Sequence, residues 1–64
     1  MVVQYLVNRN NDQLYKAVNN KILLMWYRSR KDWGKCTTTY QDLYIGNYID
    51  NFDLIDERSV NRYK

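Results

Sequence analysis

The chain has 64 residues with ten basic and seven acidic side chains, a single Cys, and neither His nor Pro. A chain of this length folds as one domain and buries only about 60% of its unfolded surface, so we expect a single domain over residues 1–64 without a large internal pocket. The absence of His removes the usual near-neutral acid–base group and the commonest zinc ligand. One Cys forms no internal disulfide, and small secreted domains usually need several, so we expect a cytoplasmic protein.

No segment has the features of a membrane span or of a signal peptide. The longest apolar run, residues 22–27, has six residues, whereas a membrane helix needs about 20. The apolar residues at the N-terminus lack a preceding basic stretch and are soon followed by Asn8 and Arg9. We therefore expect a soluble protein that does not bind membranes.

Two strands are predicted in the first third of the chain. Val3, Tyr5 and Val7 recur at every second position, which is the period of a half-buried strand. Residues 8–12 are rich in Asn and Asp, which favour turns. A second short strand is expected over residues 14–18.

A hairpin is predicted between this second strand and the next one. Asn19 and Asn20 occupy the two positions of the turn, where positive φ is needed and where Asn is well tolerated. Residues 22–28 form the strongest strand, and their apolar side chains on both faces indicate a central strand covered on both sides. A polar turn over residues 29–32 leads to a fourth strand over 33–38, which three consecutive Thr favour.

The apolar residues take helical spacing from Tyr40 onward, which predicts a short helix over residues 39–46. Thr38 and Gln41 stand three positions apart, the spacing of a capping box. Gly46 is a typical helix terminator.

The last residues predict an edge strand and a final helical turn. Residues 52–55 are apolar enough for an edge strand, and Asp56 and Glu57 place acid at the start of a helical turn, where the helix dipole favours it. Val60 and Tyr63 would form its inward face. The expected fold class is therefore α+β: a small antiparallel β-meander of three to four strands packed by one or two short C-terminal helices.

The charge of the chain is divided unevenly. Residues 1–38 carry seven basic and two acidic side chains, a net charge of +5, and residues 39–64 carry three and five, a net charge of −2. Residues 27–35 interleave cations with aromatic rings, a combination used both by single-stranded nucleic-acid sites and by protein hot spots. The competing interpretation is a polar hairpin tip beside a core Trp. The candidate binding surface consists of Tyr27, Arg28, Arg30, Lys31, Trp33 and Lys35.

No group of residues has the spacing of a catalytic or metal site. Cys36 lacks a base that would activate it, because the chain has no His. The acidic residues of the last third lack the alternating oxygens and the Gly of a calcium loop; they are Asp50, Asp53, Asp56 and Glu57. We therefore expect a protein that is not an enzyme and that holds no cofactor or metal ion.

Two functions are compatible with these features. The first is a non-catalytic protein-interaction or regulatory module that binds another protein through an aromatic and Arg-rich surface. The alternative is a module that binds single-stranded DNA or RNA through residues 27–35. Placement of the acidic residues 50–57 discriminates between the two functions. Beside the 28–35 turn they cancel its field and favour the first function, whereas on the opposite face they leave the basic face clear and favour the second.

Two weaker expectations accompany these functions. A central strand that is apolar on both faces suits a homodimer, in which a second copy covers one face. The length and the many Asn and Lys residues, which AT-rich codons encode, are typical of a small open reading frame from a phage or mobile element.

Overall fold

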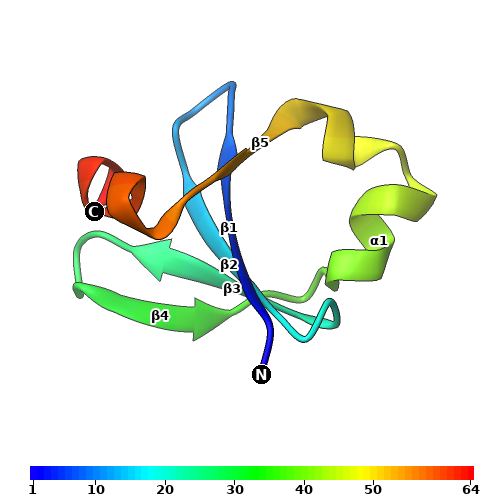
Figure 1. Ribbon diagram of the computed structural model, residues 1–64, viewed down its shortest axis with the longest axis horizontal. Helices are drawn as coiled ribbons and strands as arrows, with labels where there is room; N and C mark the ends of the chain where they lie inside the picture. The colour runs from blue at the N-terminus through cyan, green and yellow to red at the C-terminus, as the bar shows by residue number, and fades with distance from the viewer.

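Five antiparallel strands form one sheet in the order β4-β3-β2-β1-β5 (Figure 1). The computed structural model describes residues 1–64, and its strands are β1 (Val3–Asn8), β2 (Leu14–Val18), β3 (Ile22–Tyr27), β4 (Asp32–Lys35) and β5 (Phe52–Ile55). The predicted α+β class and the meander are confirmed. The sheet has five strands rather than three to four, because residues 52–55 pair with β1 and close its free side.

The turns of the meander rest on residues that accept left-handed backbone. Asn19 and Asn20 have φ of 54° and 57°, and this pair of positive angles makes the predicted hairpin between β2 and β3. Asp12 precedes β2 with φ of 57°, and Lys31 lies in the β3–β4 turn with φ of 52°.

The predicted helix is confirmed as α1 (Tyr40–Ile45), with one difference at its start. Thr39 is the N-cap and forms the capping box with Asp42, so the box lies one residue later than the predicted pair Thr38 and Gln41. The predicted fourth strand is also shorter, since β4 ends at Lys35 and the following Thr residues turn away from the sheet to reach the cap. Gly46 ends the helix as predicted, and its N–H donates to the carbonyl of Asp42.

Two short 3-10 helices complete the chain: η1 (Tyr48–Asn51) before β5 and η2 (Glu57–Tyr63) after it. Asp56 caps η2 by accepting a hydrogen bond from the Ser59 N–H at 3.0 Å. Figure 1 shows α1 and the yellow η1 on one side of the sheet and the red η2 on the other. No helix of the chain is long and apolar enough to cross a membrane.

Each face of the sheet therefore has its own core. On the face that α1 covers, which we call the α1 face, five side chains are buried together: Leu6, Ala17, Leu23, Tyr40 and Leu43. On the opposite η2 face, four are buried together: Val7, Leu14, Trp26 and Val60. Because neighbouring residues of a strand point to opposite faces, the adjacent Leu6 and Val7 connect β1 to both cores.

We predict that Leu6→Ala and Leu14→Ala each lower the free energy of unfolding by about 2–5 kcal/mol, because both side chains are fully buried. A domain of 64 residues is stable by only about 3–10 kcal/mol, so the loss is readily measured by urea denaturation. The matched control is Leu54→Ala in β5, whose side chain is 65% exposed and whose removal changes stability by about 0.5 kcal/mol or less. Equal losses at the three positions would contradict the two-core description.

Candidate functional site

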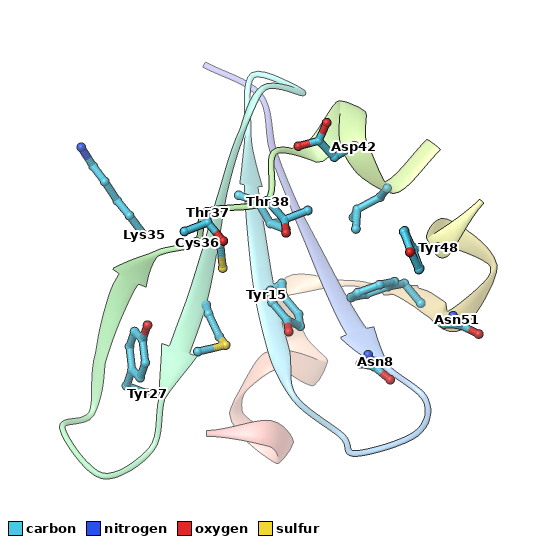
Figure 2. A pocket seen from close by; sticks show the side chains of 14 residues that line it. Asn8, Tyr15, Tyr27, Lys35, Cys36, Thr37, Thr38, Asp42, Tyr48 and Asn51 are labelled. Carbon is cyan, nitrogen blue, oxygen red and sulfur yellow. The ribbon is translucent and has the colours of Figure 1, made fainter. Parts of the chain in front are cut away.

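A groove with a volume of about 700 Å³ opens on the α1 face, between α1 and η1 on one side and the β3–β4 hairpin on the other (Figure 2). It exists because α1 has only six residues and covers one row of the face. Leu43 and Tyr40 pack over the row that contains Ala17 and Leu23. In the next row along the strands, Leu6 is buried, but its neighbour Tyr15 and the register partner of Tyr15, Met25, are left half-buried.

The floor and walls of the groove are mainly aromatic. Tyr15 and Met25 lie opposite each other on β2 and β3, and Phe52 meets Tyr15 edge-on with ring centroids 5.3 Å apart. Tyr48 lines the far wall and Tyr27 the wall nearest β4, as Figure 2 shows. Rings of this kind, with a flexible Met between them, form the usual composition of a protein-binding hot spot.

Gly34 positions Tyr27 in this wall. A Cβ atom built on Gly34 would collide with the ring of Tyr27, so the ring lies directly over the glycine backbone. The guanidinium of Arg30 lies 4.3 Å from the centroid of the same ring. Tyr27 and Arg30 therefore form one unit at the β4 end of the groove.

The polar lining of the groove is nearly neutral. It contains one cation and one anion, Lys35 and Asp42, together with Asn and Thr side chains. Burial raises the pKa of the Cys36 thiol, so this thiol is protonated at neutral pH and is a poor nucleophile. Burial, followed by the nearby Cys36, also raises the pKa of Tyr15. The groove thus offers apolar contact and neutral hydrogen-bonding groups rather than a charged site.

The structure divides the predicted binding residues between the two faces. Tyr27 lines the groove and Arg30, which is not part of the lining, lies against its ring, whereas Trp33 lies on the η2 face, where its ring meets that of Trp26 edge-on at 5.2 Å. Lys31 is exposed in the turn. Lys35 is exposed beside the groove. It lies two residues after Trp33 in β4, so its side chain leaves the sheet on the same η2 face.

Arg28 has a structural contact that its sequence neighbours lack. Its guanidinium donates to the carbonyl of Asp12 at 2.7 Å and to the carbonyl of Tyr63 at 3.2 Å. These bonds connect the β3–β4 hairpin to the turn before β2 and to the end of η2, so Arg28 is held away from the other cations of the segment.

Sequence reasoning missed a second group of cations on the η2 face. The ammonium of Lys16 lies 4.6 Å from the ring centroid of Trp33. The ammonium of Lys64 lies 4.7 Å from Trp26 and 5.9 Å from Trp33. With Lys35 they form what we call the lysine cluster. Its members come from β2, β4 and the end of the chain, so no run of charge in the sequence signals it.

The acidic residues 50–57 lie at the opposite edge of the sheet from the basic hairpin. Asp50 lies in η1 and Asp53 in β5, which is separated from β4 by three strands, whereas Asp56 and Glu57 begin η2 directly after β5. The one ion pair of the chain is also at this edge, where Arg9 Nε lies 3.1 Å from a carboxylate oxygen of Asp53. Arg9 is therefore the one cation of the basic part that pairs with a carboxylate of the acidic part, and the cations of the β3–β4 hairpin have no such partner.

Compared with known proteins, the chain matches no family model and shows no significant similarity to a curated protein or to a solved structure. No three His, Cys, Asp or Glu side chains gather closely enough to hold a metal ion.

A phenol network fixes α1 to β1 beside the groove. The hydroxyl of Tyr40 donates to Gln4 Oε1 at 2.8 Å and is hydrogen-bonded to the hydroxyl of Tyr44 at 2.9 Å. Burial, followed by the hydrogen bond with Tyr44, raises the pKa of Tyr40 to about 12. Ionisation of this phenol is therefore coupled to the folded state.

We predict that stability falls as the pH rises from about 10 to about 12, because the unfolded chain loses the Tyr40 proton in this window while the folded chain retains it. An ultraviolet titration of the folded protein should show late phenolate ionisation from Tyr40 and from Tyr15, whose pKa burial also raises. Tyr40→Phe should reduce the late absorbance change by one tyrosine and remove its share of the stability loss, and Tyr48→Phe, at an exposed ring, should leave the late change intact. An undiminished late change in Tyr40→Phe would contradict the assignment.

Proposed function

We propose that the chain is a non-catalytic protein-interaction module whose aromatic groove binds an apolar segment of a partner protein. The observation that supports this most is the groove itself, with Tyr15, Tyr27, Tyr48 and Phe52 around Met25. Truncating aromatic anchors of this kind commonly costs an interface about 2 kcal/mol or more.

The shape and charge of the groove favour a protein segment over other occupants. A small ligand is usually enclosed over most of its surface, about 70–90%, whereas this groove is open to solvent rather than enclosed. A phosphate backbone requires several cations, whereas the lining offers Lys35 and the carboxylate of Asp42. An apolar or neutral peptide would place its side chains between the rings, and its backbone would hydrogen-bond to the Asn and Thr side chains at the rim.

The test is affinity capture with the full chain, using a variant of the floor. Met25→Lys introduces a charge between the rings and should lower recovery of a stoichiometric partner at least tenfold, which corresponds to about 1.4 kcal/mol. Leu54→Lys introduces the same charge on an exposed side chain outside the groove and should capture normally. Circular dichroism of both variants verifies that they are folded.

Two results would contradict the groove proposal. One is the absence of any stoichiometric partner for the wild-type chain in cells that express it. The other is a partner whose recovery is the same with Met25→Lys as with Leu54→Lys.

A second function, binding of single-stranded nucleic acid, is favoured by one specific observation. The sheet order places the basic β3–β4 turn and the residues Asp50 and Asp53 at opposite edges. Asp32 is therefore the one carboxylate beside Arg30 and Lys31 in the turn, and their field is only partly cancelled. Long-range attraction of phosphates depends on the field that remains.

Fluorescence anisotropy with a single-stranded oligonucleotide at about 50 mM salt tests this second function. The double variant Arg30→Gln/Lys31→Gln should weaken binding and reduce the slope of log affinity against log salt by about 1.4, since each phosphate contact contributes about 0.7. Arg9→Gln/Arg58→Gln removes the same charge elsewhere and should change the slope less. Absence of binding at this salt concentration rules the function out.

A further inference from the structure

The η2 face of the sheet is covered over only one half. η2 packs over Val7, Leu14 and Trp26, which are buried. At the other end of the same strands, Val3, Val18 and Ile22 lie side by side in register and no element covers them.

Leu24 belongs to the same uncovered area. It shares the strand parity of Ile22 and lies in the next row, so Val3, Val18, Ile22 and Leu24 form one aliphatic area, which we call the bare patch. Ile22 is 52% exposed, whereas Leu14, at the covered end of the face, is fully buried.

The lysine cluster borders the bare patch on the side toward η2. In the register of the sheet, Lys16 and Lys35 flank Leu24 on the two neighbouring strands. Lys16 and Lys64 lie over the Trp33 ring. The one ion pair of the chain joins Arg9 to Asp53, so none of the three ammonium groups is paired with a carboxylate.

The combination of aliphatic patch and unpaired ammoniums selects among possible occupants. A second copy of the chain, packed face to face with its lysine cluster against this one, would be repelled by the like charges. A nucleic acid would find cations for its phosphates. However, the rings beside the patch, Tyr5 and Trp33, lie with their centroids 6.3 Å apart and two ammoniums lie over Trp33, so the patch itself offers bases only aliphatic side chains.

Asp56 and Glu57 line a hollow with Val3 at the β1 border of the patch, so the charge of the surface is polarised. A protein segment with apolar side chains and with carboxylates on the side of Lys16 and Lys35 makes favourable contacts with both the patch and the lysines.

The width of the bare patch fits a helix. Three neighbouring strands span about 10 Å from first to last, and a helix with its side chains is about 10–12 Å wide. A helix laid on the patch would extend the layer that η2 begins.

We infer that the bare patch and the lysine cluster together form a docking surface for an acidic amphipathic helix of a partner protein. Its apolar stripe lies on Ile22, Leu24 and Val18, and its flanking carboxylates pair with Lys16 and Lys35. This surface lies on the opposite face of the sheet from the aromatic groove, so the inference does not depend on the function proposed for the groove.

The experiment uses the full chain and two designed helical peptides of about 18 residues. The first has a Leu stripe flanked by Glu, and the second has Gln in place of every Glu. Isothermal titration calorimetry should show binding of the Glu peptide and about tenfold weaker binding of the Gln peptide, since several partly exposed ion pairs are lost.

Matched variants locate the contact. Lys16→Gln/Lys35→Gln should weaken the Glu peptide about tenfold and leave the Gln peptide unchanged. The control Lys21→Gln/Lys31→Gln removes the same charge from two turns and should bind the Glu peptide as the wild type does. Ile22→Asp should weaken binding of both peptides, and Met25→Lys in the groove should weaken binding of neither.

Because Lys16 is half-buried, the double variant could fail to fold, and Lys35→Gln alone is then tested. This single variant should also weaken binding of the Glu peptide, but by less than the double variant.

Three outcomes would overturn the inference. Equal affinity for the two peptides would show that the lysines do not pair with the carboxylates of the helix. Tighter binding of a single-stranded oligonucleotide than of the Glu peptide, lost in Lys16→Gln/Lys35→Gln, would assign the face to nucleic acid. A dimer in analytical ultracentrifugation that Ile22→Asp dissolves would assign the patch to a second copy of the chain.

Discussion

The structure depends on burying both faces of one sheet with very short helices. Leu6 and Val7 are consecutive in β1, and each is buried in a different core. The covering elements are a six-residue α1 and two 3-10 helices, which are too short to shield a five-stranded sheet. Each face is consequently covered over one half, and the uncovered halves are the aromatic groove and the bare patch.

Side-chain periodicity and turn propensity predicted most of the strands and helices, because these elements are determined by residues close together in the sequence. The alternation of Val3, Tyr5 and Val7 identified β1, and the pair Asn19 and Asn20, both with positive φ, identified the tightest turn. The end of β4 was predicted less well. The three Thr residues after Cys36 have high strand propensity, but Thr39 is used to cap α1, and a cap requires the chain to leave the sheet.

The candidate site was harder to predict than the fold because it is built from residues distant in sequence. The segment 27–35 is continuous, yet the strand alternation directs Tyr27 to the groove and Trp33 to the η2 face. The partners of each residue come from elsewhere: Tyr15 and Phe52 beside the groove, Lys16 and Lys64 around Trp33. Periodicity in the sequence indicates the face of the sheet on which a side chain lies. The neighbours of Tyr27 and Trp33, by contrast, depend on the order of the strands and on where the C-terminal residues pack.

Strand order also explains how a chain of small net charge presents two chemically different surfaces. The meander carries the basic residues outward to β4, and the return of β5 to β1 places the acidic residues at the far edge. Had the chain returned to β4 instead, carboxylates would lie beside the lysines and pair with them. With β5 against β1, the single ion pair forms at the acidic edge, and Lys16 and Lys64 have aromatic neighbours in place of carboxylates. An ammonium over a ring keeps most of its charge available to a third group, because a cation–π contact is attractive without neutralising it. The groove on the α1 face is nearly neutral and would therefore select an apolar segment. The lysine cluster on the η2 face would select an acidic one.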